Sequence, residues 1–375
     1  MESKSWLQLL DSMRYQGDPL ADKAIESVVR EHGANKLKSA NAYSSVEGLA
    51  KQGDKECTEF LAFYDRDPPW LKDSSIPWVS RFRDGRRFFV RNAPSAGLAL
   101  MYGSLIALFA VNSENKVLLK TGRLSHYGDV QRRIFETLAF VKDIVLCEDI
   151  KDIKRTVCKV RLLHAQVRYF IKNSCGTWNS LEQHGEPVNQ EDQLATLLAF
   201  SIAVIKGLRK LGIQGSNNEH NNYLLLWKFV GHYLGVHENL LCDTMSETSD
   251  LSDIIKQRLC HPDEASQNLT NALLTSFTHR MPFYLSFSVS SQLSRYIIDD
   301  ERIANGLGLE KVTFSTKVVI NLLYGFNIVL EFLQHYIGPF ENLLYKFGRK
   351  ALTSLVEVSL HNNKPSFTFK TLKPN

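Results

Sequence analysis

A single histidine, His164, lies inside the apolar stretch VRLLHAQVR (residues 160–168), between Arg161 and Arg168. A helix over 152–173 places His164 on a stripe of apolar side chains, with the two arginines on adjoining parts of the same face. One interpretation is a core histidine that hydrogen-bonds a carbonyl group. The other is an axial haem ligand, because haem needs a neutral imidazole nitrogen, an apolar wall and cations for its propionates. The stretch alone does not decide between them.

A second polar set precedes this helix, in TGRLSHYGDVQRRIFETLAFVKDIV (residues 121–145). Arg133 and Thr137 are four positions apart and share a helix face, and Glu136 lies beside them. The three side chains could line the far side of a pocket whose near wall is the His164 helix. They could also be the solvated start of a helix with arginine–glutamate pairs. A shared site requires these two helices to face each other.

Helical periodicity dominates the elements that would position these side chains. Near the start of the chain, Asp18 followed by Pro19 predicts the first turn of a helix. We expect loops over 52–95, where proline and glycine recur, and strand-like alternation only at 88–92 and 366–370. Further helices are predicted at 96–111, 127–147, 152–173, 191–211, 222–235, 250–258, 265–279, 284–304 and 316–358. The sequence therefore predicts one mostly α-helical domain.

Composition indicates a globular protein with a substantial core. The chain has 375 residues, of which 44% are hydrophobic and 23% charged, with a formal net charge of +5. It has no long block of lysine or arginine, so nucleic acid is not an expected partner. The six cysteines are scattered without a CxxC pair, which disfavours a zinc ribbon and fits a reducing compartment. Because the N-terminal segment lacks the apolar region of a secretory signal, we expect a cytoplasmic protein.

Two apolar segments bear on that expectation. Residues 96–111 are fewer than the roughly 20 that a membrane-spanning helix needs. Residues 318–338 form a longer segment, but polar residues such as Asn321, Glu331 and His335 interrupt it. We expect both segments to form buried amphipathic helices. Contact of the second segment with a membrane surface is the alternative.

Six sequence blocks follow one another in a distinctive order over about residues 15–310. They are GDPLAD, VLLKTGRL followed by the Arg133/Thr137 pair, VRLLHAQVR, GEPVNQEDQLATLLAFSIAVIKGLRKLGI, YLLLWKFVGHYLGV and RYIIDDERIANGLGL. Their combined order and spacing, rather than any one motif, resemble the DUF2236 family. This family includes the latex-clearing proteins (rubber oxygenases) and the fungal mpaB-type oxygenases.

The resemblance implies a b-type haem protein with a globin-like helical core. It implies that His164 is the proximal ligand of the haem iron, and that Arg133 and Thr137 are the family's arginine and threonine. Before that threonine the rubber oxygenases carry a lysine that can bind iron from the distal side, whereas this chain has Glu136. A distal lysine ligand is therefore not expected here. Glu136 is instead a candidate general acid or base.

The expected function is a haem b-dependent oxygenase that uses dioxygen to cleave a carbon–carbon double bond in a hydrophobic, isoprenoid-like substrate. Arg161 and Arg168 are the expected partners of the haem propionates. Two alternatives stay open: a haem protein that binds, senses or scavenges oxygen, and a haem-free helical interaction protein. The expected domains are a helical and loop extension over 1–94, a haem-binding core over 95–315, and a C-terminal amphipathic helix and tail, packed on the core, over 316–375.

Overall fold

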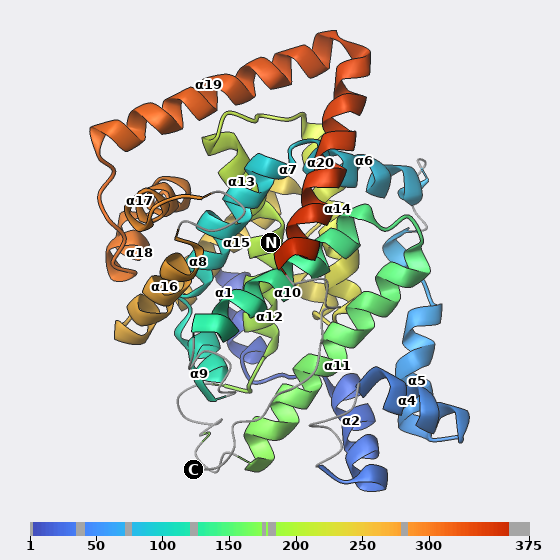
Figure 1. Cartoon of the computed structure of the whole chain (residues 1–375). Coiled ribbons are helices and arrows are strands. Elements are labelled where there is room, and N and C mark those ends of the chain that lie inside the picture. Colours follow the sequence, from blue (N-terminus) through green and yellow to red (C-terminus); the bar gives the residue numbers. More distant parts are fainter. Residues whose placement is uncertain are drawn as a thin grey trace.

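The computed structural model is built almost entirely of helices (Figure 1) and describes residues 3–34, 42–71, 77–120, 127–174, 178, 185–278 and 284–359. Within these residues the only β-type pairing is one antiparallel bridge between Val111 and Cys260, so the predicted all-α fold is confirmed. The elements, in chain order, are α1 (Ser3–Met13), α2 (Pro19–His32), α4 (Ala42–Lys51), α5 (Lys55–Ala62), η1 (Phe63–Asp65), η2 (Pro69–Leu71), α6 (Trp78–Arg91), α7 (Ala93–Leu98), the π-helical η3 (Ala99–Ser104), α8 (Leu105–Leu108), α9 (Asn112–Lys120), α10 (Tyr127–Leu146), α11 (Ile150–Ser174), α12 (Gln190–Phe200), α13 (Ile202–Lys210), α14 (Asn217–Tyr233), η5 (Glu238–Leu240), α15 (Met245–Leu259), α16 (Glu264–Phe277), α17 (Phe287–Ile298), α18 (Glu301–Gly306), α19 (Phe314–Tyr336) and α20 (Gly338–Ser359).

One large apolar core is shared by most of these helices. The helices α1 and α6, from the expected extension over 1–94, contribute Trp6 and Phe82 to it. Helix α6 packs closely along α14, and Gly85 permits this approach. A Cβ atom at Gly85 would lie 2.5 Å from the backbone carbonyl oxygen of Asn222. The N-terminal part of the chain therefore packs into the same core as the helices that follow it.

A smaller apolar cluster joins α2, α4 and α5 to one face of α11. Helix α2 begins as predicted: the Asp18 side chain accepts a hydrogen bond from the Ala21 amide, and Pro19 occupies the first turn. Figure 1 shows α11 as a long green helix with the blue helices α2, α4 and α5 beside it. Leu162 and Ala165 of α11 belong to this cluster. The side of α11 that carries His164 faces away from this cluster, toward α10 and α14.

The loops predicted over 52–95 are wrong for much of that range, because α5 and α6 lie in it. Gly85 lies inside α6 and does not end it. Its missing side chain lets α6 approach the backbone of α14. The strand-like alternation at 88–92 is also misleading, because Phe88 and Phe89 are buried on a helix. The second strand-like piece, 366–370, lies outside the described residues.

Helix α19 differs most from expectation. The prediction that 318–338 is buried is wrong, because Leu322 is 70% exposed and Phe326 is 58% exposed. By length and composition α19 is able to cross a membrane: an 18-residue window has a mean hydropathy of 1.4, and only 17% of that window is buried. The other apolar segment, 96–111, lies in the core as expected. In Figure 1, α19 runs along one edge of the molecule before α20 turns back across it.

Candidate active site

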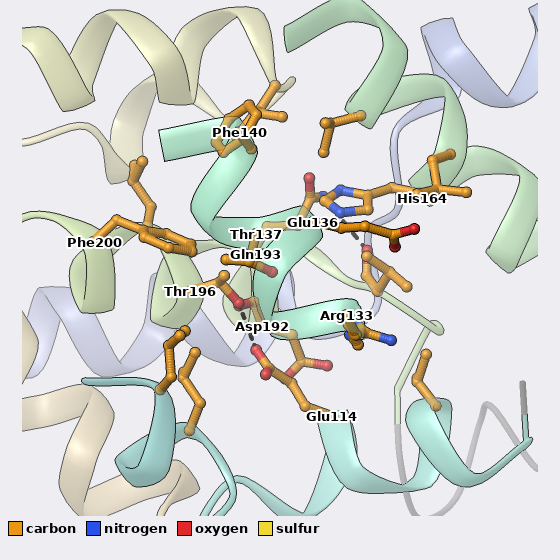
Figure 2. A pocket seen from close by; sticks show the side chains of 18 of the residues that line it. Glu114, Arg133, Glu136, Thr137, Phe140, His164, Asp192, Gln193, Thr196 and Phe200 are labelled. Atoms are coloured by element: carbon orange, nitrogen blue, oxygen red, sulfur yellow. Dashed lines mark hydrogen bonds between the residues drawn. The ribbon is translucent and has the colours of Figure 1, made fainter. Parts of the chain in front are cut away.

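A pocket of about 270 Å³ lies between α8, α9, α10, α11, α12 and α14. Most of its walls are apolar, and they include Phe140, Phe200 and Trp227. The rings of Phe200 and Trp227 stack with their centroids 5.1 Å apart. In Figure 2, Phe140 and Phe200 lie on the left, with Arg133 and His164 on the right. The pocket therefore offers a broad apolar surface with a few polar side chains.

His164 lines this pocket from α11, and its imidazole points toward α10 in Figure 2. Burial lowers the pKa of His164 to about 4, and the positive charges of Arg168 and Arg133 add to this effect. An interaction with the Gln193 side chain acts in the opposite direction. The ring is therefore neutral at neutral pH, which is the form that ligates a metal. In the described part of the structure its buried Nδ1 atom has no hydrogen-bond partner, which leaves a ring nitrogen available to a ligand.

Arg133, Glu136 and Thr137 line the same pocket from α10. Helices α10 and α11 pack against each other, so His164 and the polar set of α10 meet at one cavity. Arg133 is close enough to His164 to lower its pKa and close enough to Glu114 to lower the pKa of that carboxyl group. The cationic side chain of Arg133 thus influences both sides of the pocket.

Two carboxyl groups of the pocket, on the half-buried Glu114 and the buried Asp192, were not identified from the sequence. The Thr196 hydroxyl donates a hydrogen bond of 2.7 Å to Oε1 of Glu114. Asp192 accepts hydrogen bonds from the Ser113 hydroxyl at 2.7 Å and from the Asn189 amide at 2.9 Å. Asp192 lies in the NQED block, which was a usable signal, whereas Glu114 in NSENK resembles a solvated helix start.

Burial gives these two carboxyl groups unusual acidities. It raises the pKa of Glu114 to about 8, with a further contribution from the charge of Asp192, while Thr196 and Arg133 oppose the rise. Burial also raises the pKa of Asp192 to about 6, against the hydrogen bond from Ser113. At neutral pH the pocket therefore holds a largely protonated acid beside a largely ionised one. Such a pair is typical of a site that transfers protons.

Arg161 and Arg168 lie outside the pocket lining and face α2 instead. Arg161 forms two hydrogen bonds with the Asp18 carboxylate, of 2.6 and 2.8 Å. Arg168 donates to Asp22 at 2.8 Å and to the Val188 carbonyl oxygen at 3.1 Å. Both guanidinium groups are thus paired with protein carboxylates, and they tie α2 to α11. Of the three arginines singled out in the sequence, Arg133 is the one that reaches the pocket.

The NQED block at the start of α12 holds several distant segments together. The Gln190 side chain donates to the carbonyl oxygens of Gly17 at 2.8 Å and Gly235 at 2.9 Å. The fully buried Glu191 carboxylate pairs with Arg14 at 3.1 Å and with Arg258 at 2.7 Å. These bonds bring the GDPLAD, NQED and GHYLGV blocks, which are far apart in the sequence, together beside the pocket.

Comparisons with known proteins place the chain in a family. Residues 94–326 match the family model described as "ER-bound oxygenase mpaB/B'/Rubber oxygenase, catalytic domain". The chain is 22% identical over 333 residues to the rubber oxygenase of Streptomyces sp. (strain K30), covering 82% of this chain and 76% of that protein. The latex clearing protein LCP, in a structure of its closed state, has a similar fold, with a TM-score of 0.65 and 18% identity over 92% of this chain and 90% of that one. The chain belongs to the family of mpaB and rubber-oxygenase catalytic domains.

Proposed function

We propose that this protein is a haem-dependent oxygenase that acts on a hydrophobic, unsaturated substrate of isoprenoid type. Family membership supports an oxygenase, and the apolar pocket supports a hydrophobic substrate. The observation that carries the haem assignment is His164, a half-buried and neutral imidazole on the wall of that pocket. Polyisoprene, the substrate implied by the name of the Streptomyces relative, is the first candidate to test.

The residues of the pocket fit a haem group. His164 would hold the iron, because its neutral ring and unpartnered buried nitrogen match a metal ligand. Aromatic side chains such as Phe140, Phe200 and Trp227 would give the porphyrin an apolar wall. We propose Arg133 as the cation for a propionate, because it lines the pocket, whereas Arg161 and Arg168 lie outside the lining. When bound, haem would supply the activation of dioxygen.

The other side chains of the pocket would bind the substrate and handle protons. The apolar walls would take up a hydrocarbon chain and exclude water from it. Thr137 presents a hydroxyl on the helix opposite His164, and Glu136 presents a carboxyl group beside it. Glu114 holds a proton at neutral pH and can donate it, while Thr196 fixes its Oε1 atom. The rubber oxygenases have a lysine at the position of Glu136, so we propose that no lysine competes for the iron here.

Oxygen consumption tests the proposed activity. Haem-loaded protein would be incubated with cis-1,4-polyisoprene latex and with a panel of shorter isoprenoids and terpenoids, and carbonyl products would be trapped and identified. We expect oxygen uptake and matching carbonyl formation with at least one substrate. The Glu136→Ala variant should keep its haem and change in activity, whereas the exposed Glu59→Gln variant should match the wild type. A haem-loaded protein without uptake or product across the panel would instead indicate an oxygen-binding protein.

A further inference from the structure

The outward face of α19 is mostly apolar and carries no charged side chain. Six side chains exposed by 41% to 84% follow one side of the helix, and we call them the apolar stripe: Phe314, Val318, Leu322, Phe326, Val329 and Phe332. The lysine and glutamate of α19 are Lys317 and Glu331. Helical spacing places both of them away from the apolar stripe. A surface of this extent, free of charge, marks an interaction site in a folded protein.

The opposite face of α19 is fixed to the body of the molecule. The amide of the buried Asn327 donates to the Leu211 carbonyl oxygen at 2.7 Å. The Glu331 carboxylate accepts hydrogen bonds from the backbone amides of Gln214 at 2.9 Å and Gly215 at 2.6 Å. These bonds hold α19 flat on the molecule along the 211–215 segment, so the apolar stripe points away from the protein.

Positive charge accompanies this apolar surface. In the first turns of α20, Leu343 and Phe347 are 60% and 58% exposed, and helical spacing places Lys346 and Lys350 on the same side. The carboxylates of α19 and α20 nearest to this surface are already engaged: Glu331 binds backbone amides, and Glu341 pairs with Arg87 at 3.0 Å and Arg91 at 3.6 Å. The exposed side of the first turns of α20 is therefore both apolar and cationic.

We propose that α19 and the first turns of α20 dock the protein on the surface of a lipid bilayer that contains anionic lipids. The apolar stripe would lie at the boundary between headgroups and acyl chains, and Lys346 and Lys350 would contact the headgroup phosphates. A second copy of this chain fits less well, because the engaged Glu331 and Glu341 leave its α19 and the first turns of its α20 without a carboxylate to meet these lysines.

The helix lies on the bilayer and does not cross it. Its length and hydropathy would allow a crossing, but a crossing would have to remove Asn327 and Glu331 from their partners on the body. Both polar side chains would then enter hydrocarbon without those hydrogen bonds, which is costly. Docking on the surface keeps every one of these bonds and buries only the apolar stripe.

Vesicle sedimentation with the full chain tests this docking. We expect the wild type to bind phosphatidylcholine vesicles with about 30% phosphatidylserine more strongly than pure phosphatidylcholine vesicles, and to lose part of this preference at high salt. The double variant L322E/V329E should reduce binding by about tenfold or more, because it places two carboxylates in the apolar stripe. The matched control V79E changes an exposed apolar residue of α6 and should bind like the wild type. Circular dichroism would verify that each variant is folded.

Two further variants separate the alternatives. K346E/K350E should lose the preference for anionic vesicles. The chain has five native tryptophans, so the signal of F326W is its emission minus that of the wild type, and this difference should be blue-shifted and quenched more by shallow brominated lipids than by deep ones. Stronger quenching by the deep lipids would show a crossing helix and overturn surface docking. Wild-type protein that binds neither vesicle would also overturn the proposal. A dimer that L322E/V329E dissociates, without vesicle binding, would assign the apolar stripe to a second copy.

Discussion

Replacing Glu114 by glutamine tests the unusual acidity of the pocket. In the folded protein the pKa of Glu114 is about 8, against an ordinary value of 4.5. Between these two values the folded state holds a proton that the unfolded chain releases, so stability falls as the pH rises through this window. One pKa unit corresponds to about 1.4 kcal/mol, so the free energy of unfolding loses about 3 kcal/mol by pH 7 and about 5 kcal/mol above pH 8. These are upper figures, because any water in the pocket would solvate the carboxylate.

Glutamine has the shape of the protonated acid and does not ionise, so E114Q should escape this loss. We expect E114Q and the wild type to have similar stability near pH 4.5. At pH 8 we expect E114Q to be more stable by roughly 3 kcal/mol, since its amide oxygen can still accept the Thr196 hydrogen bond. Urea unfolding followed by circular dichroism across this pH range measures the difference, with E59Q as the control on an exposed face of α5. Parallel pH profiles for E114Q and the wild type would refute the reasoning.

Three other predictions follow from single contacts. T196V removes the hydroxyl that donates to Glu114, so the pKa of Glu114 should rise further, which infrared titration of the protonated carboxyl band would detect; an unchanged or lower pKa would contradict this. D18A leaves the buried Arg161 without its carboxylate and should lower the free energy of unfolding by about 3–5 kcal/mol. D18A/R161M should lose less, because it also removes the unpaired charge. Equal losses in the two variants would contradict this explanation. G85A should lower the free energy of unfolding by about 1–3 kcal/mol, because its Cβ meets the backbone of α14 at 2.5 Å. G48A, on the open face of α4, should be neutral or raise it by up to about 1 kcal/mol. A denaturation midpoint for G85A equal to or above that of G48A would contradict the packing argument.

Much of the site was predictable because it rests on helical periodicity. The spacing of Arg133 and Thr137 placed both on one face of α10, and the apolar periodicity of 152–173 placed His164 on a buried side of α11. The sequence also predicted the start of α2, since an aspartate before a proline is a local signal that needs no tertiary contact.

What the sequence did not reveal depends on partners far along the chain. Arg161 and Arg168 have the charge that a propionate needs, but Asp18 and Asp22 lie more than 140 positions away and become their neighbours only in the fold. The acidity of Glu114 comes from burial by other helices, which spacing within NSENK does not show. Nor does the pattern of 318–338 reveal which face of α19 remains uncovered, because that depends on where the 211–215 segment lies.

The absorption spectrum of the purified protein tests the central assignment most directly. After expression with haem precursor, the wild type should show a Soret band that shifts between the ferric, ferrous and carbon-monoxide-bound forms. H164A should lose this band, whereas H261A, which changes an exposed histidine, should keep it. A wild-type protein without a Soret band, or an H164A protein with an unchanged spectrum, would contradict the assignment of His164 as the haem ligand.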